Sequence, residues 1–187
     1  TTSATVTDYS GSGFTLNGSG AAGAQNTPQS TSDRFGISQS AMNFDGTDDM
    51  LSGSAASILP SGSAARTGCA WGLTTVDPGN GNAQGLMGYG TNSANQTFGV
   101  YPFHSTTDTF MLGAYTSSST FFYAQMPGSG WPLNQWAHYC VIVTGATAVE
   151  YYMNGIKLNQ SGTFGSPSIG TVLSLFRIGT SISGASR

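Results

Sequence analysis

The sequence has 187 residues, of which 38% are hydrophobic and only 7% charged, and its formal net charge is −3. This length suits one domain with its own core, and the hydrophobic content excludes a disordered chain. Five basic residues scattered along the chain offer no basic patch for phosphates, which argues against nucleic-acid binding. No apolar run reaches the ~18 residues of a membrane span, so none is expected. The low-charge composition, rich in Ser, Thr and Gly, favours an extracellular, cell-surface or virion protein.

The first part of the chain is mostly loop in its pattern. Residues 1–32 are rich in Thr, Ser, Gly and Ala, and only Val6 and the pair Phe14 and Leu16 resemble strands. Next come the apolar runs Ala41–Phe44 and Met50–Leu51, with Asp45-Gly46 between them. Asp-Gly between apolar runs is typical of a tight hairpin turn, because glycine adopts positive φ at no cost. The pattern therefore predicts a hairpin here.

Short strand patterns recur from residue 69 onward, and between residues 86 and 123 they follow at intervals of about 10–12 residues, which is typical of a β-sandwich. Those expected are 69–73, 86–89, 97–101, 109–112, 120–123, 135–144, 149–153, 156–158 and 172–179. The longest, 135–144, is apolar on both faces toward its end and is expected to be central. Asn154-Gly155 predicts a second hairpin. With no helical periodicity, the sequence predicts an all-β fold, a two-sheet antiparallel jelly-roll sandwich.

The chain has two cysteines, Cys69 and Cys140, each inside an apolar run. Two buried thiols are the simpler expectation. A disulfide requires Cα atoms within about 7 Å, which the sequence leaves open. With His104 and His138 as the only histidines and no Cys-x-x-Cys, a zinc site is not expected.

Several motifs, taken in order, resemble a laminin-G-like domain of the concanavalin A-like lectin/glucanase fold. They are Asp8-Tyr9-Ser10-Gly11, Asp33-Arg34-Phe35-Gly36, Ala41 to Asp49, Cys69-Ala70-Trp71, Trp136-Ala137-His138, Tyr152-Met153-Asn154-Gly155 and Phe176-Arg177-Ile178-Gly179. The resemblance implies one domain over residues 1–187. Family members also have a strand before the first motif and one after the last, which this sequence lacks. Either they lie outside this sequence or a neighbouring subunit supplies them; unpaired sheet edges would favour association.

The resemblance raises the possibility of a glucanase, which the residues argue against. Glycoside hydrolysis usually requires two carboxyl groups flanking one bond. The hydrolytic branch of the family carries a Glu-x-Asp-x-x-Glu strand, whereas Glu150 is the only glutamate here. No Gly-x-Ser-x-Gly elbow presents a nucleophilic serine, and His138 is expected to be structural. The chain is therefore predicted not to be an enzyme.

Calcium is the cofactor that the residues favour, because it binds six to eight oxygen atoms on irregular backbone. Asp45, Asp48 and Asp49 could supply some of them, together with Asp8. The resemblance also implies a structural calcium near such loops. The alternative is that Asp45 begins a turn and that Asp48 and Asp49 face solvent.

Glycan binding would use aromatic rings for sugar C–H faces and amides for hydroxyl groups. Trp131, between Gly130 and Pro132, is the best candidate for an exposed anchor, and Tyr101, Phe103, Asn80 and Asn82 are the other candidate contacts.

Two functions follow from the pattern and the resemblance. One is a recognition or adhesion module that binds glycan or another cell-surface ligand. The alternative is a structural virion component, such as a phage capsid decoration or fibre domain, or a surface-layer subunit, acting through homo-oligomer or other subunit contacts.

Overall fold

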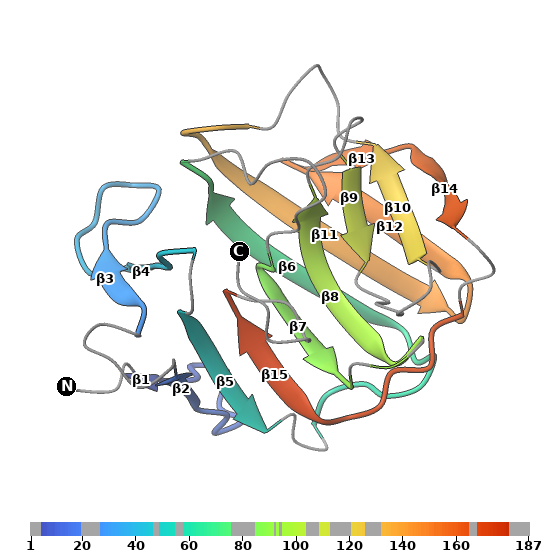
Figure 1. Ribbon diagram of the computed structural model, residues 1–187, viewed down its shortest axis with the longest axis horizontal. Helices are drawn as coiled ribbons and strands as arrows, with labels where there is room; N and C mark the ends of the chain where they lie inside the picture. The colour runs from blue at the N-terminus through green and yellow to red at the C-terminus, as the bar shows by residue number, and fades with distance from the viewer. Residues whose placement is uncertain are drawn as a thin grey trace.

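The computed structural model describes residues 5–19, 27–46, 49–54, 58–75, 85–91, 93, 95–103, 109–112, 121–125, 132–164 and 168–179. The regular elements in these ranges are all strands (Figure 1). They are β1 (Thr5–Val6), β2 (Leu16–Ser19), β3 (Gln29–Thr31), β4 (Ala41–Asn43), β5 (Met50–Ser54), β6 (Arg66–Leu73), β7 (Met87–Gly90), β8 (Thr97–Phe103), β9 (Thr109–Leu112), β10 (Phe121–Gln125), β11 (Trp136–Gly145), β12 (Ala148–Met153), β13 (Ile156–Leu158), β14 (Gln160–Phe164) and β15 (Leu175–Ile178). A helix long and apolar enough to cross a membrane is not found in the described ranges.

The strands form two large sheets and one small one. The nine-stranded sheet has the order β1-β2-β5-β15-β7-β8-β9-β10-β14, and the four-stranded sheet has the order β13-β12-β11-β6. Strands β3 and β4 form a separate two-stranded sheet, which stands to one side of the sandwich in Figure 1. Neighbouring strands in all three sheets are antiparallel.

The core lies between the two large sheets. Strand β11 shows why: alternate residues of a strand point to opposite faces, and every second residue of β11 from Ala137 to Val143 is buried. These side chains join one cluster with Phe98 and Val100 of β8 and Phe122 of β10. The predicted two-sheet antiparallel jelly-roll sandwich is therefore confirmed, and β11 lies inside its sheet as expected.

A glycine lets the two sheets approach closely. Gly68 in β6 is buried beneath the ring of Phe98 in β8. A Cβ atom built on Gly68 would lie 2.8 Å from Cε1 of that ring, closer than carbon atoms pack. The absence of a side chain at this position therefore sets the spacing of the sandwich beside β6.

One of the two predicted hairpins is wrong and the other is confirmed. Strand β4 pairs with β3, whereas β5 pairs with β2 and β15, so Asp45-Gly46 connects two different sheets. Gly46 has a positive φ of 78° and turns the chain, but the strands on either side of it, β4 and β5, do not pair with each other. Asn154-Gly155 does join paired strands, β12 and β13, with φ values of 51° and 80° that suit a type I′ turn.

The expectation that no strand precedes the Asp8 motif is wrong, because β1 lies before it and pairs with β2. Two strands also lie where no strand pattern was recognised. β3 falls in the predicted loop over residues 1–32, and β14 follows β13 directly. β3 is exposed along its length and has no alternation of buried and exposed residues. The residues of β14, Gln-Ser-Gly-Thr-Phe, are mostly small and polar. Both strands pair through their backbones, which a search for hydrophobic alternation does not detect.

Candidate functional site

The outward side of the four-stranded sheet carries an unusual set of side chains. Its outward residues, named here the outer sheet face, are Thr67, Cys69, Trp71 and Leu73 of β6, Trp136, His138, Cys140 and Ile142 of β11, Glu150 and Tyr152 of β12, and Lys157 of β13. The strand register places Trp71 beside His138 and Leu73 beside Trp136. Trp71 and Leu73 are at least 40% exposed on this face, and adjacent exposed apolar side chains make it the candidate for contacts with other molecules.

A stack of rings and one cation occupies the β6 edge of this face. The Trp71 and His138 rings have centroids 5.0 Å apart and are inclined by 35°. The Arg34 guanidinium carbon lies 4.1 Å from the centroid of the Trp71 ring and 4.0 Å from that of the Phe35 ring. Trp71 is 44% exposed and Phe35 is 69% exposed. Each exposed cation–π contact contributes about 0.5–1 kcal/mol, so the stack holds Arg34 at the surface in one position.

The turn between β3 and β4 carries Arg34 and Phe35, and Asp33 fixes its shape. The Asp33 carboxylate accepts hydrogen bonds from the backbone N–H groups of Phe35, at 2.8 Å, and Ile37, at 2.9 Å. The Asp33 backbone amide also donates a hydrogen bond to the Ile37 carbonyl, and the Asp33 carbonyl accepts one from the Gly36 amide. An aspartate that caps the amides after it is the usual device for stabilising such a turn. The small β3–β4 sheet thus presents Arg34 to Trp71 on a hydrogen-bonded turn.

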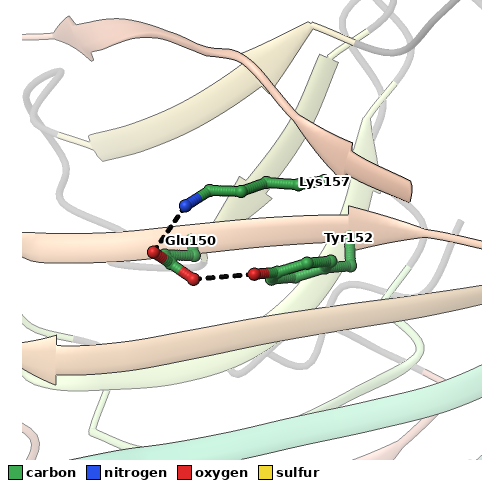
Figure 2. Close-up of polar contacts among 3 residues, drawn as sticks. All are labelled: Glu150, Tyr152 and Lys157. Carbon is green, nitrogen blue, oxygen red and sulfur yellow. Dashed lines mark hydrogen bonds and ion pairs between the residues drawn. The ribbon is translucent and has the colours of Figure 1, made fainter. Parts of the chain in front are cut away.

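A polar cluster lies on β12 and β13, on the other side of the face (Figure 2). The Tyr152 hydroxyl donates a hydrogen bond of 2.9 Å to one Glu150 oxygen, and the Lys157 ammonium contacts the other at 2.6 Å. Glu150 and Tyr152 lie two residues apart on β12, and Lys157 is the register partner of Tyr152 on β13. The strands thus place all three polar ends together.

The three groups of this cluster shift one another's pKa values. The hydrogen bond from Lys157, and then that from Tyr152, lowers the pKa of Glu150. The hydrogen bond to Glu150 raises the pKa of Tyr152, and the same carboxylate raises the pKa of Lys157. At neutral pH the cluster therefore holds a carboxylate, an ammonium and a neutral phenol, which together accept and donate hydrogen bonds.

A disulfide lies between the ring stack and the polar cluster. Cys69 and Cys140 are register partners on β6 and β11, with Cα atoms 4.2 Å apart, and their sulphur atoms are bonded. The expectation of two buried thiols is wrong: the cysteines are bridged, and Cys69 is exposed. The alternation of β6 turns Cys69 outward with Trp71 and Leu73, so the apolar run that suggested burial belongs partly to the exposed face.

The structure does not bring the predicted ligand contacts together. Tyr101 is only 4% exposed, and its ring lies against Gly88 and Gly99. The prediction that Tyr101 contacts a ligand at the surface is therefore wrong. Strand alternation turns Tyr101 away from the core cluster, but other residues cover it. The backbone of Phe103 ends β8, and its side chain lies outside the described residues, as do Trp131, Asn80 and Asn82. The roles of these four stay predictions.

The predicted calcium ligands have local roles in turns. Asp8 accepts hydrogen bonds from the backbone amides of Ser10, at 2.7 Å, and Phe14, at 3.0 Å, and those from Ser10 chiefly lower its pKa. Asp49 is only 3% exposed, so it does not face solvent, and it accepts a bond of 3.0 Å from the amide of Asp45. Asp48 lies outside the described residues. Calcium binding stays a prediction.

Among the described residues, one group of three His, Cys, Asp or Glu side chains brings its ligand atoms within 4.8 Å of one another. It consists of Cys69, His138 and Cys140, not of the aspartates. In the oxidised protein both sulphur atoms are bonded to each other and neither is a thiolate.

The face joins motifs that are far apart in the sequence. Arg34 contacts Trp71, Trp71 stacks on His138, and the backbone amide of His138 donates a 2.8 Å bond to Asn154 Oδ1. The sequence pattern identified these motifs but not their role as one surface. The alternation of β6, which turns both Trp71 and Leu73 outward, was the signal that could have indicated it.

No protein-family model matches the sequence, and no curated protein matches it either. Among solved structures, the chain is similar to domain 4 of AbnA, a GH43 extracellular arabinanase from Geobacillus stearothermophilus, in complex with arabinotriose. The TM-score is 0.48 and the identity 14%, over 94% of this chain and 89% of that one. A likeness of this size does not indicate what the present chain binds.

Proposed function

We propose that the chain is a non-catalytic recognition module of the laminin-G-like type, acting outside the cell or on a virion, and that its outer sheet face binds glycan. The observation that carries the proposal is the stack of Phe35, Arg34, Trp71 and His138 at one exposed face. Sugars present C–H faces to aromatic rings and hydroxyl groups to polar side chains. The Phe35 ring, 69% exposed, suits the former, and the Arg34 donors suit the latter, while the Trp71 ring supports the guanidinium.

The disulfide supports the proposed location. Disulfides form and persist in oxidising compartments, such as the extracellular space, and are rare in the reducing cytosol. The bridge also joins the two strands that carry most of the face, β6 and β11. A binding face gains affinity when its side chains are held in place before the ligand arrives.

A glycan array probed with the oxidised chain, followed by calorimetry on any sugar it captures, tests the proposal. Trp71→Ala should weaken binding by about tenfold or more, because it removes a ring and the support for Arg34. Tyr9→Ala is the matched control, since Tyr9 is 95% exposed and precedes β2 in the other sheet; it should bind like the wild type. Absence of binding to every glycan, or equal binding by Trp71→Ala, would refute the proposal.

Exposed apolar side chains favour a second candidate, a structural subunit contact in a virion or surface layer. Phe35, Ile37, Trp71 and Leu73 are all at least 40% exposed, and exposed apolar groups often mark protein interfaces. Light scattering distinguishes the two. A stable oligomer that Trp71→Ala disperses, in a chain that binds no glycan, would favour the subunit contact.

A further inference from the structure

Three side chains that can bind a soft metal, Cys69, His138 and Cys140, meet at the centre of the outer sheet face, with their ligand atoms within 4.8 Å of one another. The sulphur atom of Cys140 lies 3.8 Å from Nδ1 and 3.7 Å from Nε2 of His138, and Cys69 lies directly opposite on β6. In a tetrahedral zinc site, Zn–S bonds of about 2.3 Å and Zn–N bonds of about 2.0 Å place sulphur and nitrogen roughly 3.5 Å apart. The observed separation is close to that value.

We propose that the reduced, dithiol form of this chain binds one Zn²⁺ ion through the thiolates of Cys69 and Cys140 and one ring nitrogen of His138, with water as the fourth ligand. The disulfide form does not bind it, because neither sulphur is then a thiolate. The site is therefore gated by the redox state of the cysteines.

The gating step is an ordinary thiol–disulfide exchange. A dithiol reductant supplies two electrons and two protons, the S–S bond breaks to give two thiols, and the reductant becomes a disulfide. Zn²⁺ then displaces the two thiol protons, which pass to water or buffer. Cys69 is exposed, so both the reductant and the metal can reach the site from solvent.

Backbone pairing keeps the ligands together after reduction. β6 and β11 pair over their whole common length, from Leu73 opposite Trp136 to Arg66 opposite Val143, and the two cysteines are partners within that register. Opening the S–S bond removes none of these backbone contacts. The two thiols consequently stay on adjacent strands and on the same face.

The third ligand is also held independently of the disulfide. The His138 amide donates a 2.8 Å hydrogen bond to Asn154 Oδ1, and the Asn154 amide donates a 2.8 Å bond to the His138 carbonyl. Trp71 stacks on the imidazole ring. Because backbone bonds keep all three residues side by side, binding zinc requires side-chain rotation but little ordering of the backbone.

The experiment uses the full chain, once oxidised and once reduced with a phosphine and freed of it under argon. Zinc is titrated in competition with a chromophoric chelator, and Co²⁺ is added separately to detect thiolate-to-cobalt charge-transfer absorption. The expected result is roughly one tight metal ion per reduced chain, with thiolate absorption, and loss of tight binding in the oxidised chain. Reduced chain that binds no metal, or oxidised chain that binds equally, would overturn the proposal.

Variants identify the ligands. Cys69→Ser and His138→Asn should each lose stoichiometric binding in the reduced state, whereas His104→Asn, which changes the other histidine, should retain it. Equal affinity in His138→Asn and the wild type would overturn the assignment of that ligand. Circular dichroism checks folding; where Cys69→Ser is unfolded, wild type alkylated with iodoacetamide replaces it and should likewise lose binding. Metal uptake is measured without any sugar, so the result is independent of glycan recognition.

Discussion

At the scale of single residues, Gly68 is the position where the sandwich is most sensitive to added volume. Gly68→Ala places a methyl group 2.8 Å from the Phe98 ring, which must shift within a packed core. Overpacking of this kind costs about 1–3 kcal/mol. We expect urea unfolding to show that loss for Gly68→Ala. Gly145→Ala is the control, because nothing lies within 4 Å of its Cβ; equal stabilities for the two variants would contradict this account.

Arg66 is a buried cation that holds a loop by hydrogen bonds. Its guanidinium donates to the carbonyls of Pro60, at 2.8 Å, and Gly62, at 2.5 Å, and to the Tyr89 hydroxyl, at 3.0 Å. The side chain is 7% exposed, so water cannot readily replace these bonds. The arrangement connects β6 to the segment that precedes it.

Arg66→Met should therefore destabilise the fold by about 1–3 kcal/mol, because it removes the three hydrogen bonds of a buried guanidinium. The Pro60 carbonyl keeps its bond from the Tyr89 hydroxyl, and the Gly62 carbonyl keeps its bond from the Thr171 amide. Arg66→Lys should recover only part of the loss, since an ammonium lacks the forked geometry that reaches two carbonyls at once. Urea unfolding measures both. A methionine variant as stable as the wild type would show that the Arg66 bonds add nothing to those from the Tyr89 hydroxyl and the Thr171 amide.

At the scale of elements, the β12–β13 hairpin couples the protonation of Tyr152 to the charge of Glu150. The carboxylate accepts the phenol's hydrogen bond and opposes its ionisation, which raises the pKa of Tyr152. Glu150→Gln removes the negative charge, so we expect the pKa of Tyr152 to fall toward 10.0, its ordinary value. Site-resolved NMR titration of the tyrosines measures the shift.

Tyr139 provides the internal control for that titration. Burial raises the pKa of Tyr139 to about 12, and it lies on the core side of β11. Its pKa should not change in Glu150→Gln. If Tyr139 shifted as much as Tyr152, or Tyr152 did not shift, the negative charge of Glu150 would not be the cause of the raised pKa of Tyr152.

At the scale of the whole molecule, the disulfide closes a long loop. Cys69 and Cys140 are 71 residues apart, and closing a loop of this size restricts the unfolded chain. Removing such a bridge typically costs about 2–4 kcal/mol. We expect the double variant Cys69→Ala and Cys140→Ala to remain folded but to lose that amount in urea unfolding.

The redox dependence of stability provides the control for this prediction. A phosphine, in the absence of added metal, should lower the stability of the wild type to about that of the double variant and leave the double variant unchanged. A wild type that is equally stable when oxidised and reduced would show that the 71-residue loop is not the source of the stabilisation.

The sequence by itself determined the local features of this protein. Alternation over 69–73 identified most of β6, the apolar run over 135–144 identified β11, and Asn154-Gly155 specified the β12–β13 hairpin. Side-chain direction and positive φ are properties of a few adjacent residues, so the sequence suffices for them. Tertiary structure alone decided that β4 and β5 separate into different sheets, although Asp45-Gly46 suits a hairpin.

Tertiary structure also decided the candidate site. Arg34 reaches Trp71 only because the β3–β4 turn lies against β6, and Cys69 meets Cys140 only because β6 and β11 pair in one register. Both contacts join positions far apart in the chain. Such contacts depend on which sheets pack together, and hydrophobic alternation along one strand is the same whichever partner that strand takes.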